Sequence, residues 1–342
     1  ERGIFNRQAA QQQAAKYGRR DSSIDYGTNP CSEIILRPKQ FCNLSEVVIR
    51  AEDTPETLQR KVELATILGT IQSCFTDFKG LSRQWMRNTE EERLLGVSLT
   101  GILDNKMMAN QTNDNLPALL SNLRLIAVNT NRKWSKHLGI EPSAAITCVK
   151  PSGTVSQLVD AASGIHPRHS EYYIRTVRAD KKDPLTKFMT EKGFPVEDEL
   201  LKPQSMSVFS FPVKAPKGAL TRDKLSAIDH LKVWQVYSDH WCEHKPSITV
   251  SVQENEWMEV GAYVHKNFSH MSGISFLPMS EHTYKQAPYQ DSTRAEYESL
   301  LKKMPENIDW HTLSEYEEDD NTHGSQTLNC TGDVCEIVDL VQ

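Results

Sequence analysis

The chain has 342 residues, 38% hydrophobic and 25% charged, which is the composition of a globular protein with a substantial core. Its formal net charge of −6 argues against binding a nucleic-acid polymer, and no apolar run reaches the about 18 residues that a membrane span needs. Seven widely spaced cysteines exclude a disulfide-stapled secreted scaffold and indicate a reducing, cytoplasmic setting, where cysteines are buried, catalytic or metal-bound.

The first half of the chain alternates predicted helices and short strands. Residues 4–19 are rich in helix formers and predict an amphipathic helix, and residues 33–37 and 47–50 predict short strands. Thr54-Pro55 begins a long predicted helix that reaches about residue 78, because Thr caps helices well and Pro suits the first helical position. A second long helix is predicted over 116–138.

The second half continues this alternation. Residues 144–149 form a continuous apolar run that predicts a buried strand. Further strands are predicted at 173–177, 205–211, 247–252 and 273–277, with helices at 226–244 and 254–264. Strands that alternate with helices, several of them apolar on both faces, predict an α/β fold with buried parallel strands.

The C-terminal segment has a different composition. Residues 315–320 are acidic, and the chain beyond them is polar with scattered glycines. This is the composition of a linker, so we expect a folded part over 1–311 and a flexible tail over 312–342.

The segment Thr28-Asn29-Pro30-Cys31-Ser32-Glu33 combines residues that can do chemistry, and Cys42 follows eleven residues after Cys31. Alternate side chains on an extended backbone point the same way, so Asn29, Cys31 and Glu33 could face one ligand. An amide can hold a hydroxyl, a carboxylate can take its proton, and a thiol can perform redox or hydrogen-atom chemistry. The alternative is a simple turn started by Asn29-Pro30, with Cys31 as a small buried side chain.

A second pair of thiols, Cys330 and Cys335, lies in the expected tail. A mobile dithiol suits thiol–disulfide exchange, because it can carry electrons between a buried disulfide and an external reductase. A zinc site would need two more Cys or His ligands, and only His323 is near in sequence, so we expect no metal there.

The run Lys150-Pro151-Ser152-Gly153-Thr154-Val155-Ser156 follows the apolar strand and leads into a predicted helix. Free backbone N–H groups at a helix N-terminus, together with hydroxyls, can hold a phosphate. The run lacks the Gly-Lys-Ser/Thr ending of a Walker loop. A helix that is merely capped by Ser or Thr is the alternative.

Together these three features resemble the large catalytic chain of ribonucleotide reductases, and the likeness covers nearly all 342 residues in family order. Four short sequence motifs are most similar to the adenosylcobalamin-dependent class (class II) in its ribonucleoside-triphosphate reductase form. These motifs lie at 164–168 (GIHPR), 172–175 (YYIR), 273–278 (GISFLP) and 284–289 (YKQAPY).

The resemblance implies an oxidoreductase that makes 2′-deoxyribonucleotides for DNA synthesis, with adenosylcobalamin as cofactor. The implied fold is the C-terminal portion of a ten-stranded α/β barrel around a central finger loop. Cys31 matches the thiyl-radical cysteine at the loop tip, which abstracts the ribose 3′-hydrogen. Glu33 matches the general base on the 3′-hydroxyl, and Asn29 the amide that orders the ribose hydroxyls.

The remaining motifs have matching roles in the family. Cys42 matches one half of the dithiol that reduces the 2′-position, and Ser152, Gly153, Thr154, Val155 and Ser156 match the loop that holds substrate phosphates. Cys330 and Cys335 match the tail that re-reduces the active-site disulfide, with thioredoxin as the usual external donor.

One departure from the family concerns Cys42. Its dithiol partner lies upstream in the family, whereas Cys31 is the first cysteine here, and the chain begins with Glu1 rather than Met. We therefore expect the C-terminal part of a reductase that lacks turnover without an N-terminal reductase segment or chain. Residues 1–311 would then be an incomplete catalytic barrel portion and 312–342 a redox tail.

Alternatives remain open at this point. A class I ribonucleoside-diphosphate reductase fragment would need a radical-generating small subunit and a late tyrosine pair, yet Tyr284 and Tyr289 are not adjacent. A non-catalytic binding or regulatory chain with a reductase-like fold, or a simple thiol oxidoreductase, would belong to other functional classes. The chain has no Asp-x-His-x-x-Gly motif, so no histidine is expected to bind cobalt. The three other cysteines are expected to be buried: Cys74, Cys148 and Cys242.

Overall fold

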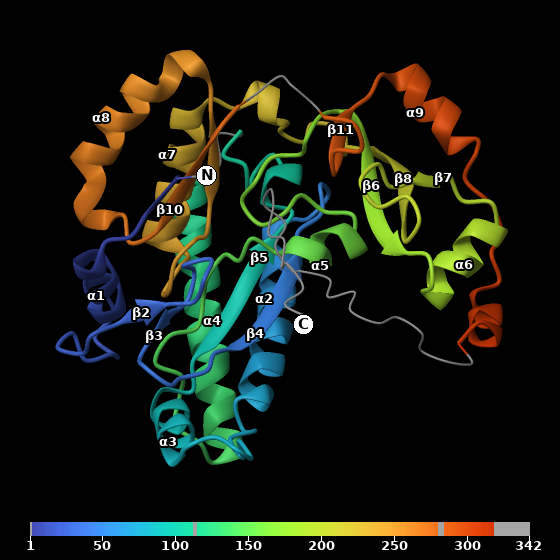
Figure 1. Ribbon diagram of the computed structural model, residues 1–342. Helices are drawn as coiled ribbons and strands as arrows, with labels where there is room; N and C mark the ends of the chain where they lie inside the picture. Colours follow the sequence, from blue (N-terminus) through green and yellow to red (C-terminus); the bar gives the residue numbers. More distant parts are fainter. Residues whose placement is uncertain (1, 112–114, 280–283, 318–342) are drawn as a thin grey trace. The chain divides into compact units, whose positions relative to one another are not determined.

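The computed structural model describes residues 2–111, 115–279 and 284–317 (Figure 1). The chain divides into two compact units. The first comprises Glu1–Arg168 and Lys217–Met279, and the second comprises His169–Pro216 and Ser280–Gln342. Across the described ranges, no helix has both the length and the apolar character needed to cross a membrane. Cys330 and Cys335 lie outside the described residues.

The first unit mixes helices with short strands. Its strands are β1 (Arg2–Ile4), β2 (Gly27–Thr28), β3 (Ile35–Leu36), β4 (Asn43–Val48), β5 (Leu95–Thr100), β9 (Thr249–Val252) and β10 (Ile274–Pro278). Its α-helices are α1 (Arg7–Ala15), α2 (Pro55–Gln72), α3 (Arg83–Glu92), α4 (Leu116–Leu138), α5 (Gly153–Leu158), α7 (Ala227–His240) and α8 (Trp257–Asn267). Short 3-10 helices lie at Ile102–Asp104, Arg222–Lys224, Glu254–Glu256 and Phe268–His270.

A parallel array of extended segments runs through the first unit. β4 pairs in parallel with β5, and β9 pairs in parallel with β10. Isolated parallel bridges connect the two pairs, because Val97 of β5 faces Thr147 and Val149 faces Pro246. The segment predicted as a strand at 144–149 therefore lies inside the array, although it pairs only through these bridges. β1 pairs antiparallel with β10 at the edge.

Helices cover one face of this array. α2 packs on β4, β5 and α4, and Figure 1 shows α2 and α4 lying side by side along the two strands. The core also includes Trp234 and Trp241, which are fully buried. Their indole N–H groups donate to the carbonyls of Pro246 (3.0 Å) and Cys148 (2.8 Å), so the two rings fix the connecting segments of the array while satisfying their own polar atoms.

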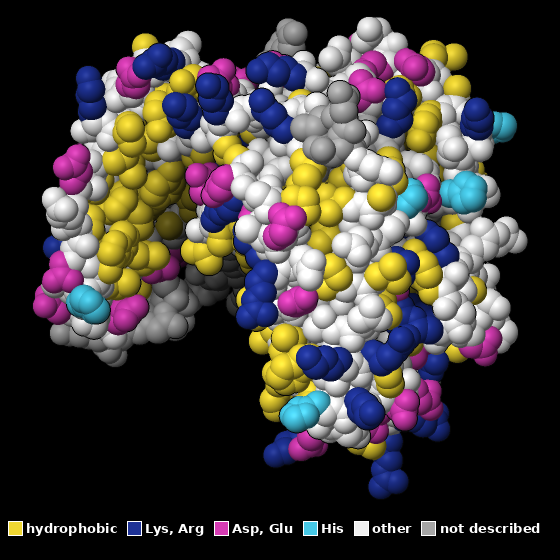
Figure 2. Space-filling view, turned by 180° about the vertical axis from the view of Figure 1, so that it is seen from behind, with side chains coloured by type: hydrophobic (Ala, Val, Ile, Leu, Met, Phe, Trp, Pro, Cys, Tyr) yellow, Lys and Arg dark blue, Asp and Glu magenta, His cyan; other side chains and the backbone are white. Residues whose placement is uncertain are grey.

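The two long helices start where their sequences indicate. Thr54 caps α2 by accepting from the Thr57 N–H, the Thr57 side chain reciprocates, and Pro55 occupies the first turn. Asn115 caps α4, which ends at Gly139 in the left-handed conformation. On its outer face α2 leaves apolar side chains exposed, among them Leu64, Leu68 and Ile71. Figure 2 shows such hydrophobic side chains at the surface between Lys and Arg side chains.

The second unit is built on an antiparallel sheet of order β11-β6-β8-β7. Its elements are β6 (Tyr172–Asp180), α6 (Pro184–Glu191), β7 (Val196–Asp198), β8 (Met206–Lys214), β11 (Tyr289–Asp291), α9 (Arg294–Leu301) and a 3-10 helix, Trp310–Glu315. The strands predicted at 173–177 and 205–211 exist, but they pair with each other antiparallel rather than in a parallel sheet. The tail boundary expected at residue 312 falls inside the 3-10 helix, whose Trp310 ring lies 5.4 Å from that of Phe188.

The mixed α/β class predicted from the sequence is confirmed. Several element bounds differ from the prediction: α2 ends at Gln72 rather than near 78, and α1 spans only Arg7–Ala15. Cys148 and Cys242 are buried as expected. The expectation for Cys74 is wrong, because α2 has ended before it and the side chain is exposed.

Candidate active site at the finger loop

The segment 29–33, called the finger loop below, connects β2 to β3, which pair antiparallel. The Ser32 N–H donates to the Asn29 carbonyl at 2.9 Å, and Ser32 has a φ of 62°. These features define a tight turn, so the convergence of Asn29, Cys31 and Glu33 expected from an extended backbone is not what the structure shows. The turn alternative describes the backbone correctly.

The three side chains have different surroundings. Asn29 uses its Oδ1 to accept from the Ile34 N–H at 2.9 Å, which closes the loop from within. Cys31 is exposed at the tip, contrary to the buried thiol that the turn alternative expected. Glu33, two residues later, is fully buried. The loop therefore presents a thiol at its tip and a carboxylate beneath it.

A buried polar network holds the base of the hairpin. The Arg20 guanidinium donates to both carboxylate oxygens of Glu92 (3.0 and 2.9 Å) and to the Ile35 carbonyl (2.9 Å). His244 Nδ1 accepts from the Ile35 N–H (3.3 Å), and its Nε2 lies 3.0 Å from the Leu95 carbonyl. Both contacts are satisfied by the neutral ring that carries its proton on Nε2. Burial, followed by the Arg20 charge, lowers the pKa of His244 to about 3, so the ring is neutral at physiological pH.

Glu33 is paired with a lysine that is distant in sequence. Lys150 Nζ donates to Glu33 Oε1 at 2.7 Å. Burial lowers the pKa of Lys150, but the Glu33 carboxylate outweighs that effect, and the pKa lies above its usual value. Glu33 Oε2 is buried and has no hydrogen-bond partner within the described residues. One oxygen of the carboxylate is therefore held, and the other is available to a ligand.

Two further thiols lie near this pair. Cys42 comes just before β4, and burial raises its pKa, while Lys150 and Arg20 act in the opposite direction. Cys148 is fully buried; burial raises its pKa, and the next contributions come from Cys42 and Glu33. A Cβ added at Gly96 would lie 3.4 Å from Cys148 Sγ and 2.5 Å from Leu44 Cδ2, so this glycine leaves room for both side chains. Both thiols are protonated at neutral pH.

The predicted phosphate loop adjoins the same lysine. Residues 150–156 lead from the array into α5, with Ser152 in the left-handed conformation and its hydroxyl donating to Glu46 Oε2 at 2.8 Å. Burial raises the pKa of the Glu46 carboxyl, against the opposing effects of Ser152 and Lys150. Ser156 is buried, and its hydroxyl donates to the Gly153 carbonyl at 2.7 Å. The exposed members of the loop are Thr154 and Val155.

The structure thus brings Cys31, Glu33, Cys42 and the start of the 150–156 loop together in the first unit. Sequence reasoning did not predict that Lys150 pairs with Glu33. It also missed three other residues near the site: Glu46, His244 and Lys245. Lys150 did stand in a run singled out from the sequence, but nothing in that run pointed to a carboxylate 117 residues away.

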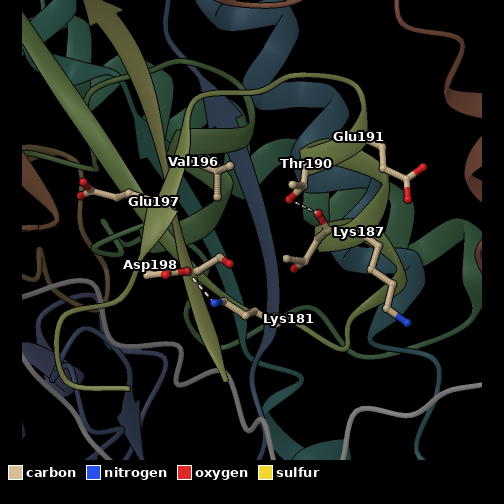
Figure 3. A pocket seen from close by; sticks show the side chains of 9 residues that line it. Lys181, Lys187, Thr190, Glu191, Val196, Glu197 and Asp198 are labelled. Atoms are coloured by element: carbon tan, nitrogen blue, oxygen red, sulfur yellow. Dashed lines mark hydrogen bonds and ion pairs between the residues drawn. The ribbon is translucent and has the colours of Figure 1, made fainter. Parts of the chain in front are cut away.

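The second unit has a surface cavity of about 560 Å³ between α6, β7 and β8 (Figure 3). Lys181 and Asp198 point toward each other there and form an ion pair at 2.5 Å. The Thr190 hydroxyl donates to the Thr186 carbonyl at 2.7 Å. None of the residues singled out from the sequence lines this cavity, so the finger loop remains the candidate site.

Comparisons with known proteins agree with the motifs. The chain is 26% identical over 337 residues to an adenosylcobalamin-dependent ribonucleoside-triphosphate reductase of Euglena gracilis, covering 97% of this chain and 45% of that protein. A protein of the same name from Lactobacillus leichmannii is 26% identical over 343 residues, covering 91% of this chain and 45% of its own length. A probable enzyme of this kind from Dictyostelium discoideum is 27% identical over 283 residues, covering 81% of this chain and 36% of its own.

Solved structures show the same fold. A crystal structure of a B12-dependent (class II) ribonucleotide reductase superposes with a TM-score of 0.72 at 24% identity, covering 86% of this chain and 44% of that one. The alpha subunit of an Actinobacillus ureae class Id ribonucleotide reductase gives 0.53 at 16% identity, covering 82% and 58%. No family model matches the chain. The resemblance to the adenosylcobalamin-dependent reductases is confirmed, and the chain spans 45% of the length of the Euglena relative.

Proposed function

We propose that this chain supplies the radical and reducing residues of an adenosylcobalamin-dependent reductase that converts ribonucleotides, in the triphosphate form, to 2′-deoxyribonucleotides. One observation carries the proposal: an exposed Cys31 at the tip of a tight loop stands two residues before a fully buried Glu33. One oxygen of Glu33 has no hydrogen-bond partner in the described part of the chain. A hydrogen-abstracting thiol must reach its substrate, and a base must be shielded from water and still hold a vacant acceptor.

In this proposal Cys31 and Glu33 act on the same ribose. Cys31, once a thiyl radical, takes the 3′-hydrogen atom, and Glu33 Oε2 takes the 3′-hydroxyl proton. The Asn29 side-chain amide faces the ribose hydroxyls through its Nδ2, since Oδ1 already accepts from Ile34. Residues 152–156 hold the phosphates, with Thr154 and Val155 as the accessible part of that loop.

Loss of the 2′-hydroxyl as water requires two electrons. Cys42 supplies one sulfur of the dithiol: two S–H bonds break, one S–S bond forms, and the 2′-carbon gains hydrogen. The protonated state of Cys42 suits this role, because the thiol must deliver hydrogen rather than act as a free thiolate. The tail cysteines Cys330 and Cys335 would then reopen the disulfide by exchange, with thioredoxin or a similar dithiol as final donor.

A thiol does not generate its own radical, and adenosylcobalamin supplies the unpaired electron when it is bound. The exposure of Cys31 fits an initiator that must approach the loop tip. The relatives from Euglena gracilis and Lactobacillus leichmannii are named as adenosylcobalamin-dependent enzymes. Class I reductases, which rely on a radical-generating subunit, remain the second candidate, supported by the fold shared with the class Id alpha subunit.

We further propose that the parallel array is one portion of a ten-stranded barrel and that turnover needs a complementary N-terminal segment. The support is the shared fold and the 45% of the relative's length that the chain spans. In the family, that segment also contributes the second sulfur of the Cys42 dithiol.

The test combines this chain with the N-terminal part of the Euglena gracilis relative, adenosylcobalamin, a small dithiol and a ribonucleoside triphosphate, and measures deoxynucleotide by chromatography. We expect product from the unchanged chain, none from Cys31→Ser, and normal product from the control Cys74→Ser, which alters an exposed thiol outside the site. Turnover that does not depend on added adenosylcobalamin but requires a second, radical-generating protein would favour class I. Product formation by Cys31→Ser, or no product from the unchanged chain, would overturn the proposal.

A further inference from the structure

We propose that Lys150 is a positioning residue for Glu33: it holds one carboxylate oxygen so that the other oxygen receives the substrate proton. The inference rests on the proposed function, since it assigns a task within that reaction. Three features carry it: the ion pair, a Glu33 oxygen with no partner among the residues that the structure describes, and the fixed backbone of the lysine.

The ion pair is close and largely shielded. Lys150 Nζ lies 2.7 Å from Glu33 Oε1, with the Glu33 side chain fully buried and the Lys150 side chain 28% exposed. The Lys150 ammonium holds Glu33 Oε1 by charge and by a hydrogen bond together, which is among the stronger polar contacts in proteins. Removing the lysine would leave this buried oxygen without its charged partner.

The second oxygen points to a ligand. Buried polar atoms are nearly always hydrogen-bonded, because an unsatisfied buried polar atom destabilises the fold. Glu33 Oε2 lacks any partner among the described residues, although Oε1 is satisfied. Because Lys150 occupies Oε1, an incoming hydroxyl meets Oε2. The hydroxyl O–H bond breaks, the proton moves to Oε2, and the carboxylic acid that forms stays oriented through Oε1.

The backbone of Lys150 is fixed on both sides. Its N–H donates to the Ser98 hydroxyl of β5 at 2.8 Å, and the preceding Val149 bridges to Pro246. Two residues later, Ser152 is tied to Glu46 at 2.8 Å. One short segment therefore positions the proposed base through Lys150 and begins the proposed phosphate loop.

Within the described ranges, other titratable groups interact with Glu33, and none of these replaces Lys150. Lys245 is the second nearby cation, but it is 1% exposed and its Nζ donates to the Gly273 carbonyl at 3.3 Å. Burial lowers the pKa of Lys245 to about 7, against the opposing effects of Cys242 and Glu33, so above neutral pH this amine is uncharged. The thiols Cys42 and Cys148 also interact electrostatically with Glu33, and burial keeps both protonated. Cys31 interacts electrostatically with Lys150.

The first experiment does not need turnover. The reactivity of each lysine amine toward trace acetic anhydride is measured by peptide mass spectrometry at pH 8–9 in the unchanged chain and in Glu33→Gln. Loss of the carboxylate lowers the pKa of Lys150, so we expect about a tenfold or greater rise in its labelling rate. Lys133, exposed on α4, is the internal control and should label at the same rate in both chains. A Lys150 rate that changes less than twofold would overturn the ion pair.

The second experiment separates positioning from a merely structural role. In the assembled enzyme, Lys150→Met should lower kcat at least tenfold, with little change in KM. Lys150→Arg should restore most of kcat, while Lys133→Met should match the unchanged enzyme. A Lys150→Met enzyme with normal kcat contradicts the inference but leaves the proposed function intact. A confirmed ion pair in an enzyme that never reduces ribonucleotides overturns both the proposed function and the positioning role.

Discussion

Gly273 lies so close to Ser32 that a β-carbon at position 273 would stand 2.5 Å from Ser32 Cβ and 2.9 Å from its hydroxyl. The same β-carbon would be 3.0 Å from Lys245 Nζ. Real β-carbons essentially never approach another heavy atom this closely, so the loop between β2 and β3 keeps its position only because residue 273 has no side chain. The close contact between Gly273 and Ser32 places the residue before β10 against the loop that presents Cys31.

Gly273→Ala should therefore displace the finger loop. We expect a loss of about 1–3 kcal/mol in the free energy of unfolding, the range for overpacking, and faster hydrogen exchange at the Ser32 amide. Denaturant unfolding and amide exchange measure the two effects. Gly261→Ala is the matched control, because a β-carbon there meets open space within α8, and it should be neutral or stabilising.

The double variant Gly273→Ala/Ser32→Gly sharpens this test. Ser32 has a φ of 62°, a conformation that glycine adopts readily, and removing its side chain removes the atoms that the new methyl group meets. We expect the double variant to recover most of the stability lost in Gly273→Ala. A double variant no more stable than the single one would show that the contact with Ser32 is not the cause.

His244 makes stability depend on pH. Its folded-state pKa is about 3, below the ordinary value of 6.5, because burial and the Arg20 charge disfavour the imidazolium. Between these values the unfolded chain binds more protons than the folded one, so the contribution of His244 is complete above pH 6.5 and falls as the pH drops toward 3. We expect about 2 kcal/mol less stability from this group at pH 5 than at pH 6.5.

Unfolding in denaturant at several pH values checks this expectation, with His244→Gln as the comparison. His230 has the same direction of shift, also to about 3 through burial and the His166 charge, so some slope remains in the variant. The slope in His244→Gln should be smaller by about one proton. An unchanged slope would mean that His244 is not the buried neutral ring that holds Ile35.

The sequence predicted the fold best where local chemistry determines it. The start of α2 followed from Thr54-Pro55 because caps and prolines act within one turn. β5 was missed although Leu95–Thr100 alternates apolar residues with Gly, Ser and Thr, the period-two pattern of a strand. The Cys31 loop was recognised, but the Lys150–Glu33 contact joins residues 117 apart and leaves no local pattern. The antiparallel pairing in the second unit likewise depends on which strands meet, and periodicity does not report that.

The buried pair Arg20–Glu92 should be costly to break. Both side chains are nearly inaccessible, at 1% and 3%, and Arg20 also holds the Ile35 carbonyl at the base of the finger loop. Burial opposes the charge of Glu92, but the Arg20 hydrogen bonds outweigh it and lower the pKa of that carboxyl. Arg20→Met leaves the carboxylate without its bidentate partner, and we expect a loss of about 3–5 kcal/mol in the free energy of unfolding.

Two companions test the cause of that loss. Arg20→Met/Glu92→Met removes both charges, and we expect it to be more stable than Arg20→Met alone. Arg294→Met breaks an exposed pair with Glu298 on α9 (2.7 Å) and should leave unfolding unchanged. If Arg20→Met were as stable as Arg294→Met, the network at Ile35 would not support the loop.

The tail cysteines lead to a separate kinetic prediction. If Cys330 and Cys335 carry electrons to the Cys42 disulfide, a small dithiol that diffuses into the site bypasses them, whereas a protein reductant does not. Cys330→Ser should therefore keep turnover with a small dithiol and lose it with thioredoxin in the assembled enzyme. Equal turnover with both reductants would remove the tail from the proposal, and Cys74→Ser should keep both activities.

The five described cysteines should differ in their reaction with iodoacetamide, because the thiolate is the nucleophile and must be accessible. Cys31 and Cys74 are exposed, whereas Cys148 and Cys242 are buried with pKa values raised by that burial. We expect the first two to be alkylated in the native protein and the buried two only in denaturant, as peptide mass spectrometry would show. Cys42, whose pKa burial also raises, should react slowly. Labelling of Cys148 as fast as that of Cys74 would contradict the burial on which the proposed site depends. If Cys74 alone reacts in the native protein, Cys31 is shielded and a cofactor-derived radical has no open path to the loop tip.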